Sequence, residues 1–213
     1  MRFKLERLPL NPENAKVEFP IIPCTVVGIP KTLDEKILCG IRGSELGSGK
    51  ADIPGGYLTI NGNRGNPIFS SFYAELKEET GIEDREIKRN LLVGHFKDNE
   101  FNNVCFIMFT ELNVKSEEII ERHRRAFEVY SKAKASGLGE VTSRKEISKN
   151  GHLVVDAWEH HTLFALPYEG NILREIIGSG EIAYGGRKHE CLQNMTAAFR
   201  ILQDMPTSDS LLL

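Results

Sequence analysis

The chain has 213 residues, with 27 Lys and Arg against 30 Asp and Glu, a formal net charge of −3, and 40% hydrophobic residues. This profile is that of an ordinary globular protein with enough chain for a substantial core. Nucleic acids and anionic lipid surfaces are bound by dense fields of Lys and Arg, which a slightly acidic chain does not supply. The composition therefore argues against general binding of nucleic acid or of a membrane surface.

Cysteine usage and hydropathy indicate the compartment. The four cysteines (Cys24, Cys39, Cys105 and Cys191) form no C-x-x-C pair and lack zinc-ligand spacing, which favours reduced, buried thiols. The longest apolar run, residues 104–109, is far shorter than the roughly 18 residues of a membrane span. Charged residues interrupt the first ten positions, so no signal peptide is expected. We expect a cytoplasmic protein without a membrane-spanning helix.

The chain begins with elements that resemble strands. Residues 1–20 are expected to form an N-terminal strand extension, because residues 2–10 alternate, with apolar Phe3, Leu5 and Leu8. The β-branched runs 21–29 and 36–42 predict an antiparallel hairpin.

A helix and two strands are expected next. Asn66 before Pro67 is a typical N-cap with a first-turn proline, and Gly81 is a typical C-terminal stop, which predicts a helix between them. The runs 91–96 and 104–109 predict two more strands, separated by a polar turn.

The following segment is interpreted as an insertion, residues 116–150, made of a helix and a hairpin. Ser116 opens an amphipathic pattern that is expected to end at Gly137. Runs 140–147 and 152–158 predict a strand pair, with a turn signal at 149–151.

The remaining elements complete the predicted fold. Residues 161–166 read as a strand, and residues 186–204 as a C-terminal helix with one apolar face. Strands placed before, between and after helices, with many hairpin turns, predict a single α/β domain over residues 1–213. Its expected architecture is a sandwich with a mixed sheet rather than a parallel doubly wound sheet.

Three carboxylates gather on one face of the first predicted helix. Glu75, Glu78 and Glu79 stand at positions i, i+3 and i+4, where like charges repel each other. A divalent cation would compensate this repulsion, because Mg²⁺ prefers carboxylate oxygens and keeps positions open for water and phosphate. A solvated acidic face is the alternative. Just upstream, Gly55 and Gly56 mark a point where the backbone approaches another group closely.

Residues 56–82 resemble the box of the Nudix hydrolases, G-x5-E-x7-R-E-U-x-E-E-x-G-U, in which U is aliphatic. The second half matches without a gap from Glu75 to Ile82. The resemblance implies a Nudix α/β/α sandwich that uses Mg²⁺ or Mn²⁺ to hydrolyse a diphosphate linked to another moiety. It also implies that Glu78 and Glu79 are the principal metal ligands. Glu75 would be a further ligand or would orient the attacking water, and Gly56, after Gly55, would open the box.

The first half of the box departs from the pattern. Ala74 stands where the pattern has arginine, and no Glu or Asp occurs between Gly56 and Ala74. These two residues are 18 positions apart where the pattern has 14, so the loop carries four extra residues. The cation that orients the carboxylates would have to come from elsewhere, for example from Lys77 or Arg64. The departures also favour an alternative, a Nudix-fold nucleotide-binding or regulatory module that has lost catalysis.

Other residues are candidates beside the box. Glu159 is expected to serve as a further ligand or general base, although a surface glutamate at a strand start is the alternative. His160 and His161 are adjacent, so at most one of them can face the site. Arg42 and Lys50 could contact substrate or cofactor phosphates, since both types bind anions, although solvated charges are the alternative.

The resemblance, together with the acidic helix face, implies a divalent-metal-dependent hydrolase of a nucleoside diphosphate linked to another moiety, a pyrophosphohydrolase. Its partner would be a small nucleotide or diphosphate substrate, with no nucleic acid and no membrane, and relatives suggest a possible homodimer. Trp158 and Tyr184 could stack on a base, although core packing explains them equally well. A third hypothesis gives the 116–150 insertion a role in binding another protein.

Overall fold

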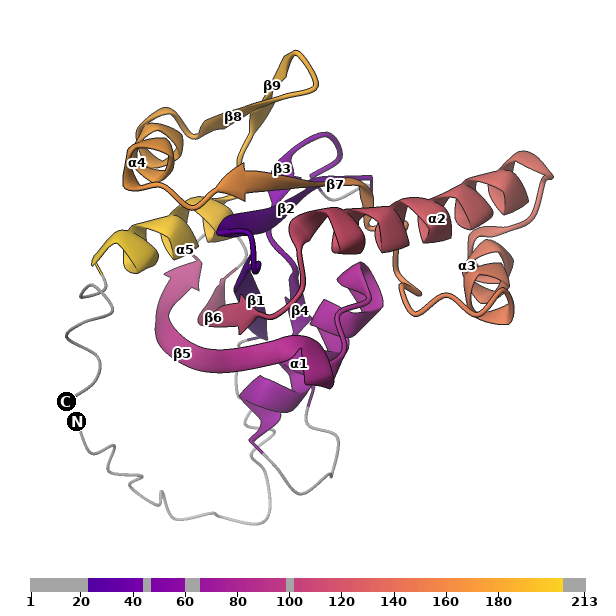
Figure 1. Cartoon of the computed structure of the whole chain (residues 1–213), viewed down its shortest axis with the longest axis horizontal. Coiled ribbons are helices and arrows are strands. Elements are labelled where there is room, and N and C mark those ends of the chain that lie inside the picture. Colours follow the sequence, from indigo (N-terminus) through magenta and orange to yellow (C-terminus); the bar gives the residue numbers. More distant parts are fainter. Residues whose placement is uncertain (1–22, 44–46, 60–65, 99–101, 205–213) are drawn as a thin grey trace, which may run out of the picture.

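The computed structural model describes residues 23–43, 47–59, 66–98 and 102–204 (Figure 1). The expected N-terminal strand extension (1–20), the loop 60–65 with Arg64, and the last residues of the chain lie outside these ranges. The four cysteines, all within the described ranges, form no disulfide with one another, and Cys39, Cys105 and Cys191 are buried, as expected. In the described part of the chain, no helix combines the length and the apolar character needed to cross a bilayer.

Seven strands form one mixed sheet. Five follow the order β3-β2-β1-β6-β5, with β4 added to β1 and β7 added to β2. β1 and β6 run parallel, and the other pairs are antiparallel. The bounds of the strands are β1 (Cys24–Lys31), β2 (Lys36–Arg42), β3 (Ala51–Asp52), β4 (Gly55–Tyr57), β5 (Ile87–Asp98), β6 (Asn103–Leu112) and β7 (His160–Pro167).

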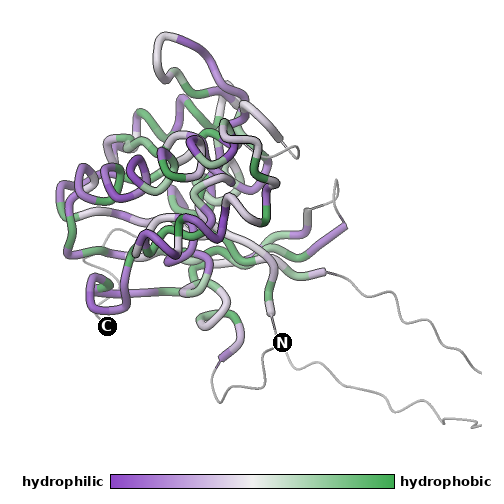
Figure 2. Tube along the Cα trace, turned by 90° about the vertical axis from the view of Figure 1, so that its right-hand side faces the viewer, coloured by the Kyte–Doolittle hydropathy of each residue, from purple (hydrophilic) through white to green (hydrophobic). Residues whose placement is uncertain are grey.

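Helices cover both faces of this sheet, so the predicted α/β sandwich with a mixed sheet is confirmed. Figure 1 shows α4 (Gly170–Ser179) and α5 (Gln193–Asp204) on one side, and α1 (Pro67–Thr80) and α2 (Ser116–Ala135) on the other. Figure 2 shows the helices as alternating hydrophilic and hydrophobic stretches, as expected for helices with one buried side.

Successive strand residues point into two separate cores. Val27 of β1 packs in the core that contains α5, whereas Val26 packs in the core that contains α1. In β6, Ile107 packs in the core that contains α5, and Met108 packs in the core that contains α1. This alternation is the period of two that a strand imposes on its side chains.

The capped helix α1 forms as its sequence predicts. The Asn66 side chain accepts a hydrogen bond from the Ile68 amide at 3.0 Å, and Pro67 occupies the first turn. Gly81 ends the helix in the left-handed conformation, with a φ of 73°. Phe72 and Leu76 are fully buried on its apolar side, which fixes the direction of the acidic face.

The predicted strand pair of the insertion is wrong. Residues 140–147 belong to helix α3 (Glu140–Lys149), and residues 152–158 contain turns and no strand. The turn signal ends the helix instead of joining two strands, because the Asn150 amide donates to the Glu146 carbonyl and Gly151 takes a φ of 75°. Ile147 of α3 is buried in a small core with Ala126 of α2. The insertion is therefore a pair of helices.

The start of the predicted C-terminal helix is also wrong. Residues 187–190 form strand β9 (Arg187–Glu190), which pairs with β8 (Glu181–Tyr184). Gly185 and Gly186 have φ values of 59° and 75°, as a two-residue hairpin turn requires. The helix begins only at Gln193. Helix α4 and the short 3-10 helix Asp84–Glu86 were not predicted.

Candidate active site

The last two turns of α1 face the glycine turn that precedes and forms β4. Glu79 is 1% exposed, and its Oε2 accepts a hydrogen bond from the Gly55 amide at 3.0 Å. Its Oε1 is buried, and no donor among the described residues reaches it. A Cβ on Gly55 would lie 2.4 Å from the Val26 carbonyl oxygen, so only glycine lets β4 lie against β1 here.

Glu75 lies one helical turn earlier, against Gly56. A Cβ on Gly56 would come within 2.3 Å of the Glu75 carboxylate, so the absent side chain is what admits the carboxylate. Burial raises the pKa of Glu75 to about 7, and the negative charges of Glu159 and Glu78 add to this. The paired glycines and the acidic helix face therefore meet, as the sequence pattern indicates.

Glu159 joins these carboxylates from the residue before β7. Burial raises its pKa, and its charge in turn raises the pKa of Glu75 and Glu79. A glutamate from a distant part of the chain is thus brought to the acidic face of α1. Three acids, Glu75, Glu79 and Glu159, converge in partly desolvated surroundings, where ionised carboxylates disfavour one another.

Arg42, at the end of β2, is a cation among these acids. Its Nη1 lies 2.8 Å from the Asp52 Oδ2, and its Nη2 lies 3.6 Å from the Glu159 Oε2. Asp52 is 1% exposed and is held by this contact and by the Ile53 amide. In the structure the guanidinium therefore faces carboxylates of the protein, where the sequence pointed to a phosphate contact. Asp52 was not a candidate from the sequence.

Glu78 lies at the outer edge of the cluster, beside a network formed by α3 and the segment that follows it. Its carbonyl accepts a hydrogen bond from the Asp156 amide at 2.9 Å. The Asp156 carboxylate accepts hydrogen bonds from Arg144 at 2.5 Å and from the Trp158 indole at 3.0 Å. The Arg144 guanidinium stacks 4.3 Å from the centre of the Trp158 ring. Burial and the charge of Asp156 raise the pKa of Glu78.

The donor set fits a hard divalent cation in its chemistry. The cluster supplies carboxylate oxygens, and one of them, the Glu79 Oε1, is buried and unpartnered. Among the described residues, no three His, Cys, Asp or Glu side chains are arranged so that they could hold a metal ion as they stand. Rotations of the Glu75 and Glu78 side chains, which are only partly buried, would be needed to bring their oxygens together.

The remaining candidates form no hydrogen bond or ion pair with Glu75, Glu79 or Glu159 among the described residues. His160 is fully buried with its ring against Gly40, whereas His161 is exposed. Lys50 forms an ion pair of 3.1 Å with Glu190. The Tyr184 ring stacks on Phe164 with 4.4 Å between the ring centres. Lys77 is exposed on α1 next to Ala74, and the two line a cleft.

No protein-family model matches the chain, and no curated protein matches it. Solved structures resemble it at low identity. A MutT protein from Methanosarcina mazei Go1 is 13% identical over 86% of this chain and 94% of that chain, with a TM-score of 0.48. A MutT NUDIX hydrolase from Burkholderia pseudomallei is 14% identical over 84% of this chain and 97% of that chain, with a TM-score of 0.46.

A MutT/nudix family protein from Enterococcus faecalis is 21% identical and covers 50% of this chain, with a TM-score of 0.37. The chain spans only 39% of the length of that protein. The names of these proteins contain the words MutT or Nudix. Residues 56–82 of this chain resemble the Nudix box. Their TM-scores are below 0.5, and none of them carries information on the activity or substrate of this chain.

Proposed function

We propose that the chain is a divalent-metal-dependent hydrolase of a nucleoside diphosphate linked to another moiety. The observation that carries this proposal is the meeting of Glu75 and Glu79 at the Gly55–Gly56 turn, with Glu159 beside them and with a buried Glu79 oxygen that no donor of the described residues reaches. Carboxylates held together in this way are expected to bind a hard cation, and such cations are used to bind phosphates.

Each residue has a role in this proposal. Glu75, Glu78 and Glu79 would hold Mg²⁺ or Mn²⁺, and a cation bound there would lower the pKa of its water and neutralise charge on the phosphates. Glu159 would accept the proton of the attacking water. Arg42, between Asp52 and Glu159, would keep the Glu159 carboxylate ionised and in place. Gly55 and Gly56 would keep β4 close enough to β1 and to α1 for the carboxylates to stay in place.

The test is a hydrolysis assay of the full chain with a panel of nucleoside diphosphate derivatives, in Mg²⁺ and in Mn²⁺. We expect release of a monophosphate product, and a loss of at least about a hundredfold in kcat for Glu79→Gln. The matched control is Glu175→Gln, which changes an exposed glutamate of α4. Absence of hydrolysis with every substrate, or full activity of Glu79→Gln, would contradict the proposal.

A second candidate function is a ligand-binding module without catalysis. It is favoured by the exposed Ala74 at the box arginine position and by the lack of a ready-made metal arrangement among the described residues. It predicts saturable nucleotide binding in calorimetry without any phosphate release. Turnover that depends on Glu79 would exclude it.

A further inference from the structure

Arg42, at the end of β2, is held beside the acidic cluster by its backbone. Its amide donates to the Lys50 carbonyl at 3.0 Å, and its carbonyl accepts a hydrogen bond from the Gly49 amide at 2.9 Å. The Arg42 side chain is 18% exposed, so the surrounding protein limits where the guanidinium can lie. Its position therefore depends on which fixed groups of the fold it contacts.

Glu159 is brought to Arg42 by the start of β7. The Gly43 amide donates to the Glu159 carbonyl at 2.8 Å. The pairing of β2 with β7 shifts its register between Ile41 and Arg42, which leaves His161 as an extra residue in β7. Bulges of this kind redirect neighbouring side chains and are frequent beside functional sites. The backbone thus places Glu159 within reach of the guanidinium.

The guanidinium is shared between two carboxylates, and the shorter contact is with Asp52. The Arg42 Nη1 lies 2.8 Å from the Asp52 Oδ2, whereas its Nη2 lies 3.6 Å from the Glu159 Oε2. Asp52 is 1% exposed, and its Oδ1 accepts a hydrogen bond from the Ile53 amide at 2.8 Å. The side chain of Asn194, on α5, also hydrogen-bonds to it. Asp52 is thus fixed by β3 and α5, and it determines where the guanidinium lies.

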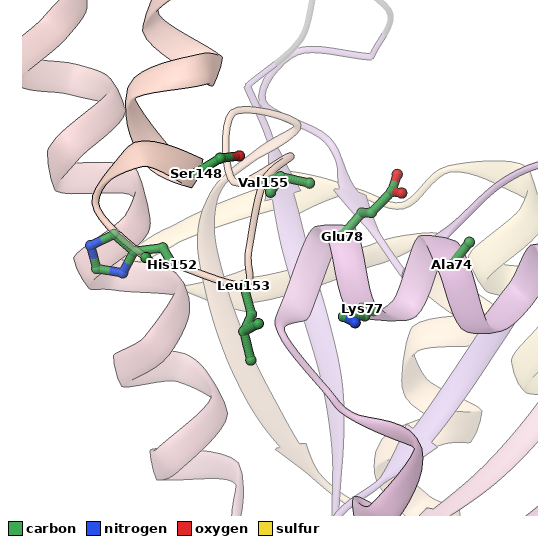
Figure 3. A pocket seen from close by; sticks show the side chains of 8 residues that line it. Ala74, Lys77, Glu78, Ser148, His152, Leu153 and Val155 are labelled. Atoms are coloured by element: carbon green, nitrogen blue, oxygen red, sulfur yellow. The ribbon is translucent and has the colours of Figure 1, made fainter.

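Carboxyl groups outnumber the cations on the cluster side of this guanidinium. The carboxyl groups that act on one another there are Glu75, Glu78, Glu79, Asp156 and Glu159. Two cations besides Arg42 act on them. Arg144 is paired with Asp156 at 2.5 Å. Lys77 leaves α1 in a different direction from Glu78 (Figure 3).

The positive charge of Arg42 acts on Glu79 as well as on Glu159. A guanidinium released from Asp52 would be drawn onto these two carboxylates, because opposite charges attract strongly in partly desolvated surroundings. Its charge would then oppose the binding of a divalent cation by the same groups.

We propose that Asp52 is a positioning residue, which holds the Arg42 guanidinium where it can orient Glu159 without pairing with the carboxylates of α1. Arg42 and Asp52 together carry no net charge, so the pair leaves the cluster able to attract a cation. In this place Arg42 supplies the positive charge that is absent at Ala74. The role given to the cation rests on the proposed function.

The first test is a titration of the full chain with Mn²⁺ alone, in which electron paramagnetic resonance measures the free Mn²⁺. Asp52→Asn keeps the shape of the side chain but leaves the charge of Arg42 unbalanced, and it should weaken Mn²⁺ binding about tenfold. The double variant Asp52→Asn with Arg42→Gln again has a pair without net charge and should bind Mn²⁺ within about twofold of the parent. Asp204→Asn, at the exposed end of α5, is the matched control.

Two results of this titration would overturn the inference. One is equal Mn²⁺ binding by Asp52→Asn and the parent. The other is a double variant that binds Mn²⁺ as weakly as Asp52→Asn does, because a merely structural role of Asp52 is lost in both variants. Arg42→Gln alone removes the opposing cation and should bind Mn²⁺ about threefold more tightly than the parent. Weaker binding by this variant would count against the inference as well.

A crystal structure of the metal-free Asp52→Asn chain tests the same inference without any ligand. We expect the Arg42 guanidinium to lie at the distance of a charged hydrogen bond, about 2.9 Å, from an oxygen of Glu159 or Glu79. A guanidinium that keeps its position in the parent would overturn the inference.

Hydrolysis separates the inference from the proposed function. The double variant should lose at least about tenfold in kcat although it binds Mn²⁺, because Glu159 has lost the group that orients it. A double variant with the kcat of the parent would overturn the inference alone. Absence of hydrolysis or of Mn²⁺ binding in the parent would contradict the proposed function alone, because the crystal structure still determines whether Asp52 positions Arg42.

Discussion

At the scale of single residues, the structure gathers carboxyl groups in surroundings that disfavour their ionised form. Glu79 is 1% exposed, and burial together with the charges of Glu159 and Glu75 raises its pKa well above the usual value. A group of this kind costs stability and is retained where function requires it. The cluster is therefore a place where stability and function oppose each other.

Removal of this charge should stabilise the metal-free protein. Because the pKa of Glu79 is higher in the folded than in the unfolded chain, the folded state binds more protons, and its stability falls as the pH rises above the unfolded value. Glu79→Gln should raise the free energy of unfolding by about 1–3 kcal/mol at pH 8 in a chelator, and by less at pH 5. Urea unfolding measures this, with Glu175→Gln as the unchanged control. A lower stability of Glu79→Gln at pH 8 would contradict the account.

The sequence allows only part of this site to be predicted. Glu75, Glu78 and Glu79 follow from helical spacing, and Glu159 was identified as a late acidic residue before a strand. Asp156 and Arg144 were missed because tertiary packing alone brings α3 and the segment after it against α1. No local pattern in the sequence records such a contact.

At the scale of elements, the errors and successes have local causes. Helix α1 was predicted at both ends because Asn66 and Gly81 cap it in the usual way. Helix α3 was mistaken for a strand because only Ser143 and Ile147 are buried on it, which leaves a weak helical period. Strands β8 and β9 were missed because most of their residues are polar and exposed, without the alternation of a half-buried strand.

The contact of Arg144 with Asp156 is expected to hold α3 and the following segment in place. The Arg144 side chain is 35% exposed, so its ion pair is partly screened, and its stacking on Trp158 adds to the contact. Arg144→Ala should increase amide hydrogen exchange in residues 140–158 while leaving the strands β1 and β2 protected. Arg124→Ala on the exposed side of α2 is the control. Unchanged exchange in 140–158 would show that packing alone positions this segment.

At the scale of the whole molecule, two buried histidines link the fold to pH. His123 on α2 is 1% exposed, and burial lowers its pKa to about 4. His160 on β7 is fully buried, and burial lowers its pKa to about 3. Both are therefore neutral in the folded chain, in the layer between the sheet and α2.

Acid should destabilise the fold through these residues. The pKa values of both histidines in the folded chain lie below the unfolded value of about 6.5. The stability that the fold gains from keeping them neutral is therefore complete above about pH 6.5. It is lost as the pH falls towards 4 for His123 and towards 3 for His160. His123→Phe, which keeps a ring stacked beside Phe127, should make the melting temperature less sensitive to pH between 7 and 5. Thermal unfolding across this range measures the slope. An equal slope in parent and variant would contradict the role of His123.

The most direct test of the central claim, that the acidic face of α1 is a divalent-metal site, is a crystal of the full chain soaked in Mn²⁺ and measured for anomalous scattering. The account predicts a peak coordinated by Glu75, Glu78 and Glu79 beside Gly56, which disappears in Glu79→Gln. A Mn²⁺ peak elsewhere on the molecule, with none at these three carboxylates, would contradict it.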